Sequence, residues 1–386
     1  MKKDILNNQT INSSLLHFAP PFQRRVPTPP PKPGERFVFK MPETFKMLEP
    51  CKNLGGGKVR LTYYNPDAKE AAVVGIGGSL PGTYPMTKDE DGYFTVEIET
   101  TPGIHVHRYL VDGVTVCNPQ MPFAYSTMEP CNFFEAVDET CDWYMMQDVP
   151  HGDLRMEYYK SSYTGRWKAC WIYTPAGYEQ NIDKKYPVLY LQHGAGEDET
   201  GWIDMGKVNY ILDNMIAKGE CEEMLVVMNC GFAFKPEEAF GMGGSGFVQE
   251  LVCDCKPFIE ENYKVKLGKD NTAMAGLSMG SFQSQQIVFN NLDKFAYLGV
   301  IIGGINPDRE GFPKGALDDI PALNKELKVF FASNGEQEAG CENTRAKIKE
   351  LKEKGLEGAV FYSCEGYHEL TVCRNSLREF LPLLFK

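Results

Sequence analysis

Thr272-Ala273-Met274-Ala275-Gly276-Leu277-Ser278-Met279-Gly280 is the stretch of sequence that decides the fold. Its apolar beginning predicts a strand, and residues 281–289 after it predict a helix. Two glycines flank the serine at the Gly-x-Ser-x-Gly spacing, where side chains would clash in a tight strand-to-helix turn. The pattern therefore predicts a nucleophile elbow that presents Ser278; the alternative is a glycine turn that arose by chance.

Strand and helix patterns alternate on both sides of this stretch. Compact apolar runs predict strands, amphipathic runs predict helices, and Gly219 and Gly355 end two of those helices. Apolar strands alternating with helices are typical of a mostly parallel sheet buried on both faces. We therefore expect an α/β-hydrolase fold over residues 145–386. The predicted strands are 187–191, 224–228, 272–275, 298–302, 329–332 and 359–362, and the predicted helices are 207–218, 247–263, 342–354 and one from about 373.

The preceding part of the chain has a different pattern. Residues 58–64, 93–98 and 104–111 alternate with period two, and Asp112-Gly113 is a hairpin signal. These features predict a small all-β, immunoglobulin-like sandwich over residues 55–140. Residues 1–54 form a polar, then proline-rich extension that could be disordered, wrap the sandwich along its surface or join subunits in a homodimer.

A serine hydroxyl needs a neighbouring base, and in this fold the base follows the serine and the acid along the chain. Only one histidine, His368, follows Ser278, in a loop after the last predicted strand. His368 is therefore the predicted base, with a surface histidine as the alternative. The six histidines are His17, His105, His107, His151, His193 and His368.

The orienting acid is expected in the loop after the 329–332 strand. That loop, residues 333–340, holds no aspartate, so the acid would be a glutamate. Spacing favours Glu338 over Glu336, and Asp308 is the alternative outside the loop.

Two backbone N–H groups are needed to stabilise the oxyanion of acyl transfer. One is expected from Met279, directly after the serine, and the other from Gly194 or Ala195, in the loop after the first long strand. His193 precedes Ser278, so it is interpreted as a support of that loop.

Aromatic residues follow two of the predicted strands and could contact the substrate. Phe232 and Phe234 lie in a glycine-rich loop and could stack on an aromatic acyl group or a sugar ring, or merely belong to a glycine-rich turn. Trp202 is either a core aromatic or a substrate platform. His105 and His107 share one strand face but have no evident third metal ligand, so solvent-facing histidines are favoured over a metal site.

Composition excludes several classes of function. The formal net charge of −12 argues against nucleic acid or an anionic membrane as the main partner, and no apolar run is long enough to span a bilayer. The N-terminus lacks the apolar core of a signal peptide, which predicts a cytoplasmic protein, or a secreted one whose leader is missing from this chain. The twelve cysteines show no zinc-ligand spacing and are expected to be buried reduced thiols.

These motifs give the chain a recognisable family resemblance. Residues 187–194, 198–202, 257–260 and 275–280, Gly366-Tyr367-His368 and residues 380–384 resemble carbohydrate esterase family 1, the feruloyl and acetylxylan esterases of the esterase D type. The β domain is similar to family 48 carbohydrate-binding modules. In that family a second glycine usually stands at the position of Ser281, and the acid is usually aspartate.

The resemblance implies a serine esterase that releases ferulate or acetate from plant-xylan-derived saccharides through a Ser278–His368–acid triad. No metal or cofactor is expected, and the expected partner is a feruloylated or acetylated oligosaccharide. The alternatives are a ferric-siderophore (enterochelin-like) esterase and a non-catalytic carbohydrate-binding protein on the same fold.

Overall fold

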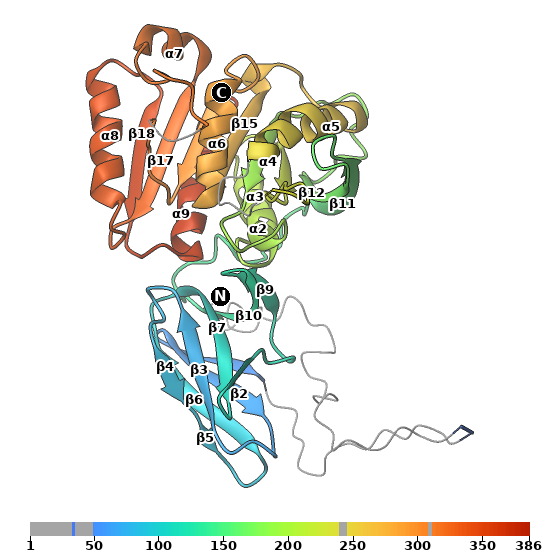
Figure 1. Ribbon diagram of the computed structural model, residues 1–386, viewed down its shortest axis with the longest axis vertical. Coiled ribbons are helices and arrows are strands. Elements are labelled where there is room, and N and C mark those ends of the chain that lie inside the picture. Colours follow the sequence, from blue (N-terminus) through green and yellow to red (C-terminus); the bar gives the residue numbers. More distant parts are fainter. Residues whose placement is uncertain (1–32, 35–48, 239–244, 308–310) are drawn as a thin grey trace. The chain divides into compact units, whose positions relative to one another are not determined.

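A computed structural model describes residues 33–34, 49–238, 245–307 and 311–386. The chain divides into two compact units. The first comprises residues 1–124 and 130–142, and the second comprises residues 125–129 and 143–386. Figure 1 labels their strands and helices. The proline-rich stretch, apart from Pro33, and the alternative acid Asp308 lie outside the described residues.

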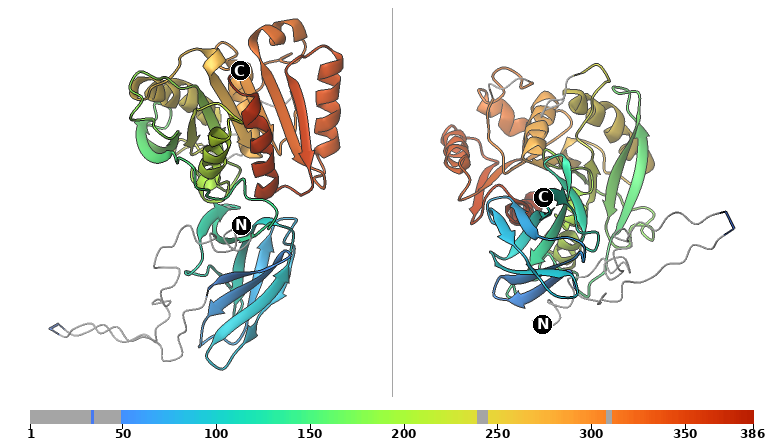
Figure 2. Two further views of the ribbon diagram at one scale, coloured as in Figure 1. Left: turned by 180° about the vertical axis from the view of Figure 1, so that it is seen from behind. Right: turned by 60° about the horizontal axis from the view of Figure 1, so that its bottom comes forward.

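The first unit is built from two antiparallel sheets, drawn from blue to teal in Figure 2. Their inward residues, among them Val59, Tyr63, Phe94, Tyr109 and Phe134, form one apolar core, as expected for a sandwich. One sheet has the order β1-β2-β6-β5 and comprises Cys51–Gly55, Lys58–Tyr64, Tyr93–Glu99 and Thr87–Lys88. The other has the order β4-β3-β7-β10-β9, with β8 paired to β7, and comprises Thr83–Pro85, Ala71–Ile76, Gly103–Val111, Glu129–Ala136, Phe123–Ser126 and Val114–Val116.

The expectation that His105 and His107 face solvent was wrong. Both are buried in β7, and both rings pack against Phe134. Polar groups of Ser79 and Thr101 lie within hydrogen-bond distance of the His105 ring, whereas neither ring nitrogen of His107 has a well-formed hydrogen bond among the described residues. Strand periodicity placed the two rings on one face but could not show that the second sheet covers that face.

The second unit is organised around one eight-stranded sheet, which Figure 1 shows with helices packed along it. Its order is β11-β12-β14-β13-β15-β16-β17-β18, antiparallel over the first three strands and parallel from β14 onward. The predicted fold class, an α/β-hydrolase sheet preceded by an all-β sandwich, is confirmed. The strands are Asp153–Lys160, Trp167–Thr174, Leu225–Asn229, Val188–Gln192, Thr272–Leu277, Tyr297–Ile301, Val329–Gly335 and Ala359–Cys364.

Helices connect the parallel strands. Residues such as Phe247, Ile259 and Ile287 bury their side chains against the sheet. The predicted 247–263 helix is a composite in which a π-helical turn separates α4 from α5. The helices are α2 Gly201–Asp204, α3 Val208–Ala217, α4 Ser245–Glu250, the π turn Leu251–Cys255, α5 Lys256–Asn262, α6 Met279–Asn290, α7 Ile320–Glu326, α8 Cys341–Glu353 and α9 Leu370–Phe380.

The register of the parallel strands positions the site. Gln192 at the end of β13 pairs with Gly276, and Leu277 at the end of β15 pairs with Ile301. The carboxyl ends of parallel strands lie at the same edge of a sheet, where α/β enzymes bind ligands. The loops after β13, β15, β16, β17 and β18 therefore converge around Ser278.

Two expectations from composition can also be compared with the structure. None of the twelve cysteines forms a disulfide, but only Cys131, Cys170, Cys255, Cys341 and Cys373 are buried, and Cys253 is exposed. The thiols are therefore not all core residues. Over the described ranges, no helix has the length and apolarity needed to cross a bilayer.

Burial of His107 predicts a pH dependence of the sandwich. Burial lowers the pKa of His107 to about 3, so between pH 3 and its ordinary pKa near 6.5 only the unfolded chain binds this proton. Stability therefore falls as pH falls through this window, by about 1.4 kcal/mol per unit from this residue. We expect His107→Leu to reduce this slope.

The measurement is urea unfolding between about pH 7 and pH 5, with hydrogen-exchange protection of β7 and β10 peptides as the reporter of the sandwich. His151→Leu, in the second unit, is the matched control and should leave the slope at these peptides unchanged. Equal slopes in the native protein and His107→Leu would show that His107 is not the titrating group.

Candidate active site

Ser278 lies in a strained turn between β15 and α6. Its backbone has φ 51° and ψ −112°, outside the regions that non-glycine residues ordinarily occupy, and its N–H donates to the carbonyl of Ile301. A Cβ at Gly276 would lie 2.5 Å from backbone atoms of Gly280, and a Cβ at Gly280 would lie 2.5 Å from the carbonyl oxygen of His193. The two glycines are thus required by close backbone approach, as expected for a nucleophile elbow.

Ser281, which stands where the family usually has glycine, fits this turn. Its hydroxyl donates to the carbonyl oxygen of Ser278 at 2.6 Å. Gly303 leaves room for it, because a Cβ there would lie 1.8 Å from the Ser281 Oγ. The departure from the family pattern therefore stabilises the turn through a hydrogen bond.

Three side chains from separate loops form one hydrogen-bonded chain. Ser278 Oγ lies 2.9 Å from His368 Nε2, and His368 Nδ1 lies 2.5 Å from Glu338 Oε1. The His368 side chain is 51% exposed and that of Glu338 13% exposed, so the imidazole faces solvent while the carboxylate lies behind it. The loops after β15, β17 and β18 thus supply a serine, an acid and a histidine in the arrangement of a hydrolase triad.

The carboxylate that is hydrogen-bonded to His368 belongs to Glu338 and not to Glu336. Glu338 also accepts hydrogen bonds from the side chain of Asn334 and the N–H of Gly335. Burial acts to raise the pKa of Glu338, but the hydrogen bonds from His368 and Asn334 outweigh it, and the pKa lies below its usual value. Glu336 instead binds Arg345 and the Ser363 hydroxyl.

The two candidate oxyanion donors in the loop after β13, Gly194 and Ala195, differ in whether their backbone N–H already has a hydrogen-bond acceptor. The N–H of Gly194 already donates to Glu197 Oε2 at 2.9 Å. Within the described ranges, the N–H groups of Ala195 and Met279 have no acceptor, and both residues line the cavity at Ser278. This arrangement favours Ala195 and Met279 over Gly194 as donors.

His193 is buried, and both of its ring nitrogens make structural hydrogen bonds, so it is not placed to act as a base. Its Nδ1–H donates to the carbonyl of Gly194 at 2.8 Å, and its Nε2 accepts the N–H of Gly231 at 2.9 Å. Burial lowers the pKa of His193 to about 4, so the ring is neutral at pH 7. The structure thus places it as a link between the β13 and β14 loops.

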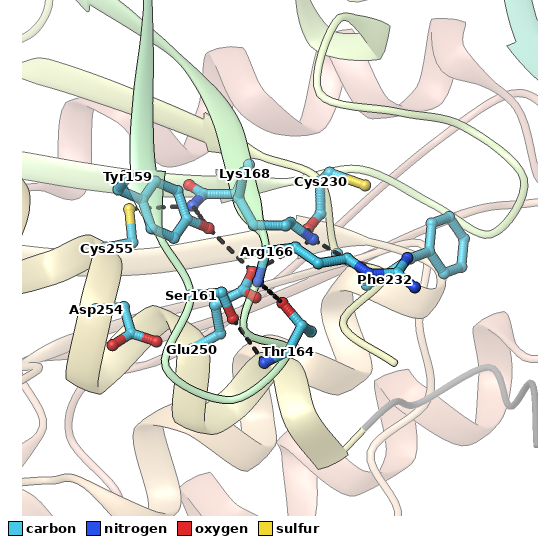
Figure 3. A network of polar contacts seen from close by, with 12 residues as sticks. Tyr159, Ser161, Thr164, Arg166, Lys168, Cys230, Phe232, Glu250, Asp254 and Cys255 are labelled. Atoms are coloured by element: carbon cyan, nitrogen blue, oxygen red, sulfur yellow. Dashed lines mark hydrogen bonds and ion pairs between the residues drawn. The ribbon is translucent and has the colours of Figure 1, made fainter. Parts of the chain in front are cut away.

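The β14 loop is held by the polar network that Figure 3 shows. Lys168 Nζ donates to the carbonyls of Cys230 at 3.3 Å and Phe232 at 2.7 Å, and lies 3.3 Å from Glu250. Glu250 is fully buried and also accepts the Tyr159 hydroxyl at 3.0 Å. A buried ion pair is stable only when such additional hydrogen bonds satisfy it. The network therefore fixes the backbone on either side of Gly231.

The three aromatic residues predicted to contact the substrate have different surroundings in the structure. Trp202 is 1% exposed and its indole N–H donates to Gln192 O at 2.9 Å, so it is a core residue and not a substrate platform. Phe232 and Phe234 are half-buried and pack against each other, Phe232 also packs against His193, and neither lines the cavity at Ser278. Their contact with substrate stays a prediction.

The cavity at Ser278 has a volume of about 250 Å³ and an apolar side that sequence reasoning missed. Phe282 and Ile302 form that side, and Ile302 has φ 42°, an unusual value for a β-branched residue. Phe282 lies one turn beyond the elbow, which is the only signal that could have indicated it. The full lining is Ala195, Ser278, Met279, Phe282, Ile302, Gly303, Gly304, Asn334, Glu338, Gly340 and His368.

One group of described residues, Glu336, Cys341 and Glu342, brings possible metal ligands within 4.8 Å of one another. Both carboxylates pair with Arg345, and such exposed acidic groups are common without a metal. We therefore assign no metal to this group.

Comparison with known proteins agrees with this geometry. Residues 161–338 match the family model described as "Putative esterase". An endo-1,4-beta-xylanase/feruloyl esterase of Xylanibacter ruminicola is 30% identical over 371 residues, which are 94% of this chain and 47% of that protein. The chain spans less than half the length of the curated relatives it matches.

Solved structures show the same fold. A ferulic acid esterase from Anaeromyces mucronatus, solved with ferulic acid, is 23% identical, with a TM-score of 0.55 over 63% of this chain and 95% of that one. The enterobactin esterase of Shigella flexneri is 13% identical, with a TM-score of 0.61 over 86% of this chain and 94% of that one. The resemblance of the sandwich to a family 48 module stays a prediction. The matched domain and the relative that aligns over nearly the whole chain make this chain similar to the esterases of carbohydrate esterase family 1, and it shares the fold of the ferulic acid esterase.

Proposed function

We propose that this protein is a serine esterase that releases hydroxycinnamate, ferulate in particular, from feruloylated saccharides. The observation that carries the proposal is the continuous chain from Ser278 through His368 to Glu338, beside the open N–H groups of Ala195 and Met279. An exposed nucleophile, a base and a preorganised oxyanion site are what acyl transfer from an ester requires. A non-catalytic binding protein would have no use for this arrangement.

The reaction proceeds in two steps. His368 Nε2 takes the proton of Ser278 as Oγ attacks the ester carbonyl carbon, and Ala195 and Met279 donate to the resulting oxyanion. The tetrahedral intermediate then expels the alcohol, which takes the proton from His368. A water molecule repeats the sequence on the acyl-enzyme and releases the acid. Glu338 keeps the Nδ1–H of His368 oriented and stabilises the imidazolium.

Hydroxycinnamate as the acyl group is supported by the cavity and by the relatives. Phe282 and Ile302 offer an apolar surface next to Ser278, which suits an aromatic acyl group. The xylanase/feruloyl esterase relative aligns over nearly the whole chain. Acetate remains a second acyl group that the same triad could transfer.

A ferric-siderophore esterase is the second candidate. It is favoured by one observation, the fold likeness to the enterobactin esterase, which covers more of the chain than the second unit alone contains. A cytoplasmic location would be compatible with either esterase, acting on imported esters, and it stays a prediction, as does a homodimer.

Substrate preference is tested by comparing the native protein with Ser278→Ala on methyl ferulate, an aryl acetate and enterobactin. We expect the highest kcat/KM on methyl ferulate, and loss of all hydrolysis in the variant. Acetate release alone would move the acyl group to acetyl. Preference for enterobactin would establish the second candidate, and activity that survives in Ser278→Ala would contradict the assigned nucleophile.

The acid is tested with a matched pair of variants in one loop. Glu338→Ala removes the group that orients His368, so kcat on the aryl acetate should fall roughly 10²- to 10⁴-fold. Glu336→Ala breaks an exposed ion pair with Arg345 and should leave kcat within about threefold of the native value. The reverse pattern would transfer the orienting role to Glu336.

The acyl pocket is tested with two phenylalanines. Phe282→Ala removes an aromatic surface from the cavity and should lower kcat/KM on methyl ferulate about tenfold or more, since an aromatic contact is worth about 1 kcal/mol beyond its buried area. Hydrolysis of the aryl acetate should change less than about threefold, because acetyl is too small to reach that surface. Phe232→Ala is the control, and a larger ferulate defect there would place the acyl group in the β14 loop.

A further inference from the structure

Glu197 is a buried carboxyl group next to the active site that the mechanism above does not use. It is 8% exposed and lies four residues after His193, in the loop that follows β13. A carboxyl group is rarely buried unless hydrogen bonds compensate for its desolvation. Among the described residues, the hydrogen bond that this carboxyl group accepts comes from the N–H of Gly194.

Glu197 makes hydrogen bonds to both backbone groups of Gly194, its N–H and its C=O. Its side-chain Oε2 accepts the Gly194 N–H at 2.9 Å, and its own backbone N–H donates to the Gly194 carbonyl at 3.3 Å. That carbonyl also accepts the Nδ1–H of His193 at 2.8 Å. Both peptide groups of Gly194 are therefore fixed, the preceding one by its N–H and the following one by its C=O.

The second of these peptide groups includes the N–H of Ala195. In a trans peptide the C=O and the N–H point in opposite directions. Because the Gly194 carbonyl is held against His193 and Glu197, the Ala195 N–H is directed away from them, and Ala195 lines the cavity at Ser278. The Glu197 carboxyl group accepts the Gly194 N–H, which leaves the Ala195 N–H as the donor on this side.

We infer that Glu197 is a positioning residue of the oxyanion hole, which orients the Ala195 N–H by clamping Gly194. The inference rests on ester hydrolysis as proposed above but not on the identity of the acyl group. The clamp needs an acceptor oxygen rather than a charge. This matters because burial raises the pKa of Glu197 to about 7, and a neutral carboxyl group still offers an oxygen to an N–H.

The test compares Glu197→Ala, Glu197→Gln and Glu199→Ala in the full-length protein, with an aryl acetate as substrate. Glu197→Gln keeps an acceptor oxygen, and Glu199 is a nearby partly buried carboxyl beside Cys230 that makes no hydrogen bond to Gly194. Loss of one oxyanion donor costs about 10²- to 10³-fold in kcat. For a misdirected donor we expect kcat of Glu197→Ala to fall about 10- to 100-fold, with KM within about threefold.

Phenylboronic acid provides a readout that a purely structural defect would not move. It forms a tetrahedral anionic adduct with Ser278 that uses the oxyanion site, so its inhibition constant should rise in Glu197→Ala by the same factor by which kcat/KM falls. Glu197→Gln should restore both quantities to within about threefold of native values, and Glu199→Ala should leave both unchanged.

Three outcomes would overturn the inference while the native protein remains active on the aryl acetate. The first is a kcat of Glu197→Ala within threefold of the native value. The second is a kcat defect without a parallel loss of boronic acid affinity. The third is a defect that Glu197→Gln shares in full, since the charge rather than the acceptor would then matter. A native protein that hydrolyses no ester would instead contradict the proposed function itself.

Discussion

The strained turn at Ser278 is the constraint on which the rest of the site depends. A serine with φ 51° and ψ −112° stores conformational strain, which the surrounding structure must hold in place. Two hydrogen bonds hold the turn: the N–H of Ser278 donates to the carbonyl of Ile301, and the hydroxyl of Ser281 donates to the carbonyl of Ser278. The close approach of Gly280 to the His193 carbonyl also constrains it. Because these partners come from β16, α6 and the loop after β13, the nucleophile can take this conformation only when the sheet is assembled.

The same assembly buries an ion pair, and it also buries hydrogen-bonded polar groups of the loops after β13 and β14. The Lys168–Glu250 pair fixes the β14 loop, and that loop donates the Gly231 N–H to His193. The Nδ1–H of His193 and the backbone N–H of Glu197 hold the Gly194 carbonyl of the peptide that carries the Ala195 N–H, and the Glu197 side chain holds the Gly194 N–H. A buried ion pair is a weak source of stability but can specify one backbone conformation. The site thus rests on a series of hydrogen bonds in which each backbone group is oriented by its neighbour. Oriented dipoles of this kind stabilise charge without reorganising during the reaction.

The fold could be predicted where the sequence carries a regular pattern. The six parallel strands were visible as short apolar runs, because five of them are buried along nearly their whole length and β18, at the edge of the sheet, is half-buried. The two antiparallel strands β11 and β12 escaped prediction. The edge strand β11 mixes charged residues such as Arg155 and Glu157 with aromatic ones, and β12 beside it begins with the exposed Trp167 and with Lys168, so neither has a continuous apolar run. His105 and His107 were placed on one face, but burial of that face depends on a second sheet that strand periodicity does not reveal.

By itself, the sequence determined the class of fold, Ser278 as the candidate nucleophile and His368 as the candidate base. These depend on local spacing and on chain order, which a linear sequence contains. Only the tertiary structure showed that Glu338 rather than Glu336 is hydrogen-bonded to His368 and that the N–H of Gly194 already has an acceptor. It also showed that Trp202 lies in the core and that Phe282 lines the cavity. Residues one or two positions apart point in different directions, and which of them meets a partner depends on strand register and loop path. Glu197 had no signal in the sequence, because its role comes from hydrogen bonds that exist only after the loop has closed on Gly194.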